Sequence, residues 1–369
     1  MAPEAVYLHG IATAVPENRY SQCFARDFMT NLHQGDPDTQ EFLKRIYDGS
    51  AIESRYSVVS DYGKAPEDYT FYPPNESLEP EPTTEKRNAV FTQEANRLSL
   101  QASRQLLADL GTVSPEDITH LITVTCTGFS APGFDFYLTK QLPLRPNVDR
   151  FQLGFMGCYA AFSALKLANS ICEADPKAKV LVVNVELCTV HFQKKKDHDT
   201  LVANAIFADG VSAALVSADP EDSTPPRFRF HNFLSQYLEE SEDDMAWKIG
   251  QTGFDMKLSV YVPRLIKRNI SSIVDDLLAK GGTQRDDIDL WAFHPGGRSI
   301  LDKVAVELDL PDDALRYSYE ILKEYGNMSS VTIMFVLKRF LERSERGHLF
   351  AAAFGPGLTV ESAYMQLER

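Results

Sequence analysis

Gly-Phe-Met-Gly-Cys-Tyr-Ala-Ala-Phe, from Gly154 to Phe162, sets a single thiol at the start of a long apolar run. The run predicts a buried helix that extends to about Cys172, with Cys158 in its first turn. Free backbone amides and the positive dipole end at a helix start stabilise a thiolate, so we expect a lowered pKa for Cys158. The alternative interpretation is a small buried hydrophobe, but the neighbouring glycines allow close backbone approach and favour a nucleophile.

Short β-rich runs alternate with helical stretches on both sides of this segment. The runs cover residues 121–126, 180–185, 213–217 and 349–354, and the helical stretches cover residues 94–110 and 266–280. Such alternation predicts an α/β fold with buried strands. Two other segments interrupt the pattern: residues 61–86 are expected to form an ordered surface excursion, and the acidic residues 239–244 a solvated face.

Two pairs of passages indicate an internal duplication. In the first pair, which begins near residues 117 and 287, a strand leads into a turn and then a helix. In the second pair, the apolar helix that opens at Cys158 corresponds to the one that opens at Asn327. Two related halves would bring both helix starts to one shared centre. Cys158, Asn327 and His294 are therefore expected to meet there.

His294 and Asn327 are suited to act with Cys158. His294 follows the apolar run of residues 290–293 and precedes Pro-Gly-Gly, which places its imidazole at the carboxyl end of a strand. A neutral imidazole there can donate to a thioester oxyanion, and an imidazolium can pair with a thiolate. Asn327 alone would be a turn residue or a helix cap. As a third member it supplies an uncharged donor, which stabilises a developing enolate where a carboxylate would repel it.

These three side chains fit decarboxylative carbon–carbon bond formation. Cys158 takes an acyl group from a thioester, and His294 and Asn327 hold the thioester carbonyl of a malonyl unit as carbon dioxide leaves. The resulting carbanion attacks the acyl-cysteine. This chemistry requires no metal, and His191 and His198 lack a metal-ligand spacing. The sequence also contains neither a dinucleotide fingerprint nor a Walker-type phosphate loop.

Composition argues against several other functions. Lys plus Arg total 37 against 52 Asp plus Glu among 369 residues, and the net charge of −15 disfavours nucleic acid and anionic membranes as partners. The five cysteines are widely spaced and form no CxxC pair, which argues against a disulfide framework or a zinc site. No signal peptide is recognisable, and no apolar run reaches the ~18 residues of a membrane span. We therefore expect a soluble, cytoplasmic protein.

The motifs together resemble those of the type III polyketide synthases, the chalcone synthase-like enzymes, over nearly the whole chain. They are the Cys158 segment, Phe-Ala-Asp-Gly at 207–210, His-Pro-Gly-Gly at 294–297, Gly-Asn-Met-Ser-Ser at 326–330 and Phe-Gly-Pro-Gly at 354–357. The resemblance implies the thiolase fold, a five-layered αβαβα arrangement of two pseudo-duplicated halves. Residues 1–220 would carry the nucleophilic Cys, and residues 221–369 the His and Asn. It also implies a homodimer that uses free acyl-CoA and malonyl-CoA, without a carrier protein or a further cofactor.

The same resemblance assigns roles position by position. Cys158, His294 and Asn327 match the catalytic triad, and Phe207 matches the gatekeeper phenylalanine between triad and pocket. For coenzyme A, the basic cluster of the family corresponds to residues 49–56, where Arg55 remains. Arg298, directly after the His-Pro-Gly-Gly turn, is the second candidate for a contact with the coenzyme A phosphates.

The expected substrate pocket departs from that of the plant enzymes. Met256 stands where they have a second gatekeeper phenylalanine, and Trp247 stands where they have glycine. The indole should narrow that end, while the flexible thioether admits a bent aliphatic chain. The other expected pocket residues are Thr127, Cys188, His191 and Phe354. We therefore expect a bacterial-type enzyme that takes an aliphatic or small acyl starter and forms an alkylpyrone, alkylresorcinol or phloroglucinol-type product.

Three other classes of protein share some of these features. A ketoacyl synthase III-like enzyme that stops after one condensation is the nearest, although Met-Ser-Ser after Asn327 and the Phe-Gly-Pro-Gly loop favour the type III enzymes. A catalytically silent protein that binds acyl chains or other proteins would not need all three triad residues. A papain-like hydrolase has the same Cys, His, Asn order, but its Cys-Gly-Ser-Cys-Trp signature is missing from this chain.

Overall fold

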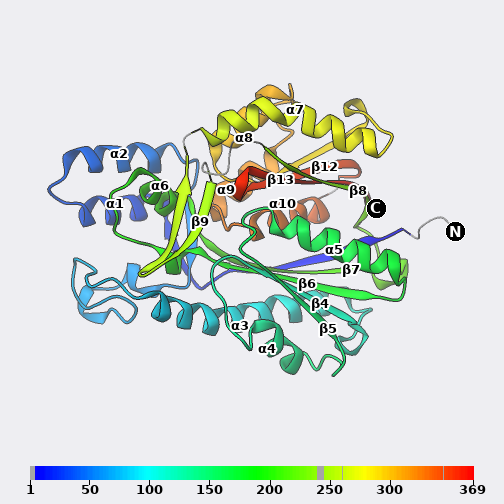
Figure 1. Ribbon diagram of the computed structural model, residues 1–369, viewed down its shortest axis with the longest axis horizontal. Helices are drawn as coiled ribbons and strands as arrows, with labels where there is room; N and C mark the ends of the chain where they lie inside the picture. The colour runs from blue at the N-terminus through cyan, green and yellow to red at the C-terminus, as the bar shows by residue number, and fades with distance from the viewer. Residues whose placement is uncertain (1–4, 239–244, 260, 344) are drawn as a thin grey trace.

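The computed structural model describes residues 5–238, 245–259, 261–343 and 345–369, which form a layered α/β structure (Figure 1). The acidic residues 239–244 lie outside the described ranges, so the solvated face expected there stays a prediction. Within the described ranges, no helix is long and apolar enough to cross a lipid bilayer.

The main sheet has nine strands in the order β11-β12-β13-β8-β1-β7-β6-β4-β5. The strands of its amino-terminal half are β1 (Tyr7–Ala14), β4 (His120–Thr125), β5 (Asp149–Gly154), β6 (Lys179–Leu187) and β7 (Asp209–Ser217). Those of its carboxy-terminal half are β8 (Arg227–Tyr237), β11 (Leu290–Phe293), β12 (Gly347–Gly355) and β13 (Thr359–Glu368). The halves join where β1 pairs with β8, at Tyr7 with Arg229 and Leu8 with Phe228.

Helices form three layers around these two half-sheets (Figure 1). The outer layer on the amino-terminal half contains α3 (Thr84–Leu110) and α4 (Phe134–Gln141), and the outer layer on the other half contains α7 (Val262–Lys280) and α8 (Arg298–Glu307). Between the half-sheets lie α5 (Ala160–Ala174) and α10 (Val331–Glu342), and α9 (Arg316–Tyr325) packs against α10. Separate apolar cores fill the spaces between layers. The predicted α/β class and five-layered thiolase fold are confirmed.

The central helix α5 buries an apolar face against the half-sheets, while Ser170 and Glu173 on its other side are exposed. Its first residues, Ala160, Ala161 and Phe162, are each 0% exposed. An apolar helix face faces the core, and the small alanines let the strands approach closely. The predicted helix after Cys158 is therefore confirmed, with its start two residues later, at Ala160.

The irregular segment before α3 is ordered, as predicted, but it is not wholly a surface excursion. Phe71, Tyr72 and Leu78 are buried. The buried carboxylate of Asp61 accepts hydrogen bonds from the amides of Thr70, Phe71 and Tyr72, which holds the segment in place. The segment is also shorter than expected, because α3 begins at Thr84.

A group of smaller elements gathers at one end of the layers, on the left of Figure 1. It comprises α1 (Gln22–Leu32), α2 (Pro37–Asp48), α6 (His198–Ile206), the paired strands β2 (Asn18–Ser21) and β3 (Ser54–Ser57), and the hairpin of β9 (Met245–Gly250) and β10 (Gly253–Leu258). These elements enclose the cavities of the candidate site.

Candidate active site

The nucleophile loop, residues 155–159, connects β5 to α5 and carries Cys158. Phe155 and Gly157 adopt left-handed φ angles of 56° and 81°. A Cβ atom on Gly157 would lie 2.1 Å from Cδ of Pro356, so only glycine lets the loop approach the Phe-Gly-Pro-Gly segment this closely. Cys158 is partly exposed, and it lines a cavity beside α5.

His294 lies directly after β11, where its backbone amide donates to the carbonyl of Ala352 at 2.8 Å. The side chain is 1% exposed, and neither ring nitrogen has a hydrogen-bond partner among the described residues. Burial lowers the pKa of His294 to about 3. The imidazole is therefore neutral, and its ring N–H is available to a bound molecule.

Asn327 is held between two other parts of the site. Its Nδ2 donates to the carbonyl of Gly296 at 3.2 Å, and its Oδ1 accepts from the amide of Ser329 at 2.8 Å. Its carbonyl accepts from the amide of Ala208, the residue that follows Phe207. Because Nδ2 carries two hydrogens, one remains available after the bond to Gly296.

These three residues, from the starts or ends of three different elements, line one cavity of about 1610 Å³, measured with its open mouth. The internal duplication explains the convergence, because α5 and α10 start at the same centre between the half-sheets. The structure therefore brings together the residues that the sequence analysis chose.

The predicted lowering of the Cys158 pKa is wrong. Burial raises the pKa of the Cys158 thiol to about 12, while a hydrogen bond from Ser329 opposes the rise and the negative charge of Glu186 adds to it. His294 does not compensate, because its imidazole is neutral. Desolvation thus outweighs the helix start, and the free site holds a thiol beside an imidazole.

The expected pocket residues fall into two adjoining cavities. Thr127 and Phe354 line the catalytic cavity, and His191 lines a second cavity of about 850 Å³. The side chains common to both walls are Cys188, Phe207, Trp247 and Met256. These four residues therefore form the partition between the two cavities.

His191 anchors one side of this partition. Its Nε2 lies 2.7 Å from the carbonyl of Thr127, and its Nδ1 accepts from the amide of Phe254 at 3.2 Å. The ring stacks on Phe254 with centroids 3.9 Å apart. Burial lowers the pKa of His191 to about 3, so the neutral ring donates from Nε2 and accepts at Nδ1. His191 ties the β9–β10 hairpin to the end of β4.

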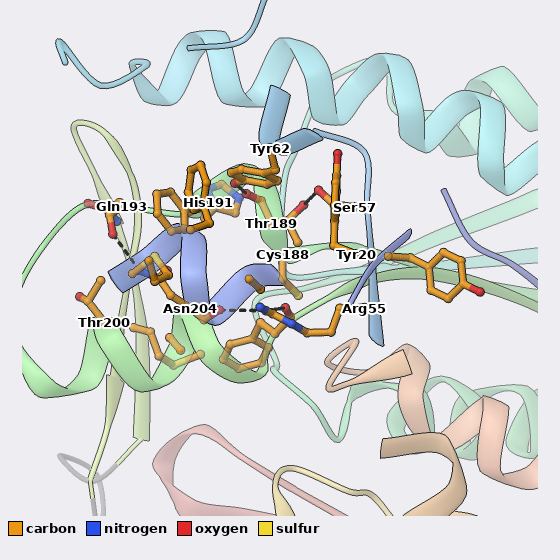
Figure 2. A pocket seen from close by; sticks show the side chains of 18 of the residues that line it. Tyr20, Arg55, Ser57, Tyr62, Cys188, Thr189, His191, Gln193, Thr200 and Asn204 are labelled. Carbon is orange, nitrogen blue, oxygen red and sulfur yellow. Dashed lines mark hydrogen bonds between the residues drawn. The ribbon is translucent and has the colours of Figure 1, made fainter. Parts of the chain in front are cut away.

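The two arginines predicted to bind coenzyme A differ in their surroundings. Arg55 lines the second cavity, where its guanidinium donates to the carbonyl of Asn204 (Figure 2). It also donates to Oε1 of Gln22 and to the carbonyl of Phe207. These bonds hold the Arg55 side chain to the protein itself, and its assignment to coenzyme A stays a prediction. Arg298 lies at the wall of the catalytic cavity, more than half exposed, with Asp302 at 3.4 Å. Its assignment to coenzyme A stays a prediction.

Sequence reasoning missed two polar residues of the site. Glu186 is fully buried and accepts from the amide of Cys126, from Thr127 and from Ser330. Burial raises the pKa of this carboxyl to about 7. The signal in the sequence that could have identified Glu186 is that it is the one acidic residue in the apolar strand β6. Arg45, an exposed residue of α2, lines the catalytic cavity. It was missed because the basic cluster of the family was placed at residues 49–56, which begin four residues later.

Metal ligands form no comparable cluster. Within the described ranges, no group of three or more His, Cys, Asp or Glu side chains could hold a metal ion.

Two helix starts that meet between stacked half-sheets, one with a thiol and the other with an amide, define the class of thiolase-fold condensing enzymes. Residues 3–220 match the family of chalcone and stilbene synthases, N-terminal domain, and residues 229–367 match the C-terminal domain of the same family. The chain belongs to the chalcone and stilbene synthase family, the type III polyketide synthases, and is accordingly an acyltransferase.

Individual relatives agree over the full chain. The alpha-pyrone synthesis polyketide synthase-like Pks18 of Mycobacterium tuberculosis is 33% identical over 98% of this chain and 91% of its own. The crystal structure of PKS-I from the brown alga Ectocarpus siliculosus superposes with a TM-score of 0.92 at 31% identity and covers 100% of both chains. That of 1,3,6,8-tetrahydroxynaphthalene synthase from Streptomyces coelicolor A3(2) has a TM-score of 0.87 at 26% identity, over 98% of this chain and 99% of that chain.

Proposed function

We propose that the protein loads an aliphatic acyl group from coenzyme A onto Cys158, extends it repeatedly with malonyl-CoA and cyclises the product. The product would be an alkylpyrone, alkylresorcinol or phloroglucinol-type compound. The observation that carries the proposal is the unpaired, neutral imidazole of His294, which shares a buried cavity with Cys158 and Asn327.

The reaction follows from the states of these groups. The Cys158 thiol gives its proton to the neutral imidazole of His294 as its sulfur attacks the acyl-CoA carbonyl, and the departing coenzyme A thiolate takes that proton as it leaves. In malonyl-CoA the bond between the carboxylate and Cα breaks, and its electron pair forms an enolate while carbon dioxide departs. His294 and Asn327 donate to the enolate oxygen. The Cα attacks the acyl carbon, and the Cys158 thiolate is released.

An aliphatic starter is supported by the second cavity. Aromatic and aliphatic side chains make up most of its wall, and several of its polar groups already have partners. Ser57 and Thr189 bond each other at 2.7 Å, and Nδ2 of Asn204 donates to the carbonyl of Gln193 at 2.9 Å (Figure 2). Such a wall suits an unsubstituted chain. The name of the mycobacterial relative, an alpha-pyrone synthesis enzyme, agrees with an alkylpyrone product.

Coenzyme A thioesters are the proposed substrates, with no further cofactor and no carrier protein. The net charge of −15 means that the coenzyme A phosphates need local basic residues. Arg298 from α8 and Arg45 from α2, both at the wall of the catalytic cavity, are the proposed contacts.

Organisation and location complete the proposal. We retain the division into residues 1–220 and 221–369, which is supported by the two half-sheets. We also propose a homodimer, which is supported by exposed phenylalanines at the edge strand β5, and a cytoplasmic location, which is supported by five unpaired cysteines. Neither nucleic acid nor a membrane is a proposed partner.

One assay tests the reaction. The protein is incubated with malonyl-CoA and a series of acyl-CoA starters, and products are identified by mass spectrometry, with Cys158→Ala as the blank. We expect products with two or more extensions from medium or long alkyl starters and none from the variant. Single-extension products would favour a ketoacyl synthase III-like enzyme instead, and polyketide formation by Cys158→Ala would overturn the mechanism.

A further inference from the structure

Cys126, the residue directly after β4, forms hydrogen bonds to three separate parts of the site through its sulfur, its amide and its carbonyl. Its Sγ accepts from the amide of Gly157 at 2.9 Å, and its own amide donates to Oε2 of Glu186 at 2.9 Å. Its carbonyl accepts from Nε1 of Trp247 at 2.7 Å. The residue is 4% exposed and lines the catalytic cavity. No role in the reaction proposed above uses it.

The contact with Gly157 concerns the nucleophile. Gly157 precedes Cys158 directly and has a left-handed φ of 81°, which glycine adopts without strain. The Cys126 sulfur accepts a hydrogen bond from the backbone N–H of Gly157. Burial raises the pKa of Cys126 well above its usual range, so the side chain stays a thiol and is not a second nucleophile. Its sulfur therefore serves as a fixed acceptor for the nucleophile loop.

The contact with Trp247 concerns the partition between the cavities. The indole lines both cavities and meets His191 edge-on, with centroids 5.7 Å apart. Because its N–H is bonded to the carbonyl of Cys126, the ring cannot turn aside without losing that bond. The position of Cys126 thus sets how far the indole reaches across the passage.

We propose that Cys126 is a positioning residue that fixes the Cys158 nucleophile and the Trp247 partition relative to each other. Through Gly157 it sets the rate of acyl transfer at Cys158, and through Trp247 it sets which starter chains reach Cys158. The proposal rests on the function proposed above only for its effect on starters and products.

The test compares Cys126→Ala, which removes the sulfur acceptor, with Cys126→Ser, which restores a shorter one. Cys172→Ala is the matched control, because Cys172 is also fully buried but lies in α5 with only weak contacts to the carbonyls of Ala178 and Val216 at 3.7 Å. Measurements are kcat and KM for malonyl-CoA, the range of starters used, and the rate at which iodoacetamide alkylates Cys158, read by peptide mass spectrometry.

We expect Cys126→Ala to lower kcat about tenfold or more with KM changed less than about twofold, because a displaced nucleophile affects the chemical step. Alkylation of Cys158 should accelerate as the loop loosens, whereas the starter range should change little, because the backbone carbonyl that holds Trp247 remains in this variant. Cys126→Ser should lie between this variant and wild type. If Cys126→Ala behaves as Cys172→Ala in all measurements, the proposal is wrong.

Two further comparisons apply if a variant or the assay fails. If Cys126→Ala does not fold, kcat and the alkylation rate of Cys158 are compared between Cys126→Ser and wild type, and equal values would overturn the proposal. Should the wild type make no polyketide, the proposed function fails, while the alkylation rates of free enzyme still decide whether Cys126 positions Cys158.

Discussion

Cys158 and His294 face one cavity with pKa values shifted in opposite directions by the same cause. Burial raises the pKa of the thiol to about 12 and lowers that of the imidazole to about 3. Each shift favours the neutral form, so the free enzyme holds no thiolate–imidazolium pair. The proton of Cys158 must therefore leave as the acyl donor reacts. A neutral thiol at rest is also less open to oxidation than a thiolate.

This state predicts the pH dependence of Cys158 alkylation. Because only the thiolate reacts, the rate with iodoacetamide should rise about tenfold per unit between about pH 7 and pH 9 without a plateau. The sign follows from the raised pKa: the thiolate fraction keeps growing until the pH reaches the pKa. The rate is measured by peptide mass spectrometry, with the exposed Cys23 followed in the same digest to monitor the reagent. A plateau near neutral pH would show an ion pair and contradict this state.

At the scale of elements, the β9–β10 hairpin decides how the interior is divided. Its two strands bring Trp247 and Met256 opposite each other in register, and both residues line both cavities. Two hydrogen bonds join the hairpin to other segments: Nε1 of Trp247 donates to the carbonyl of Cys126, and the amide of Phe254 donates to His191. The partition is therefore held in place in the free enzyme.

Removing the indole should therefore join the cavities. Trp247→Gly is expected to shift products toward longer starters or more extensions, because the chain gains the volume of the second cavity. Trp247→Phe keeps most of the bulk and loses only the hydrogen bond, so its shift should be smaller. Ile249→Ala, on the same strand but 57% exposed, is the control. Product profiles are compared by mass spectrometry, and an unchanged profile in Trp247→Gly would refute the partition.

At the scale of the whole molecule, one edge of the nine-stranded sheet exposes phenylalanine side chains beside the polar residues of its edge strand. Strand β5 ends the sheet, and Phe129, Phe136, Phe151 and Phe155 on and around it are between 37% and 44% exposed. An exposed edge strand with an apolar patch is a template for association. Cys158 follows this strand closely, so association at β5 would also support the nucleophile loop.

We therefore expect a dimer that depends on this edge. Phe151→Glu should raise the dissociation constant at least about tenfold, because a charge replaces apolar area at the centre of the patch. Val306→Glu, on α8 in the outer layer of the other half, is 70% exposed and serves as the control. Sedimentation velocity over a range of concentrations measures both. A monomeric wild type at micromolar concentration would contradict the proposed homodimer.

Much of the fold was predictable because its signals are local or repeated. Apolar runs marked β4, β6, β7 and β12, and the Gly-Cys and Gly-Asn helix starts marked the central pair α5 and α10. The β9–β10 hairpin was not predicted, since its strands carry polar residues and pack against elements far away in the sequence, such as α6 and α3. Glu186 and Cys126 were missed because their partners lie on segments distant in sequence, and no local pattern shows such contacts.

The sequence alone determined the identity and order of Cys158, His294 and Asn327, since motif chemistry is written in neighbouring residues. Only the tertiary structure decided their protonation states, because desolvation depends on which layers close over a side chain. It also decided that Arg55 binds the protein itself and that Trp247 divides two cavities. Both outcomes depend on contacts between segments far apart in the chain, whose distances no run of neighbouring residues specifies.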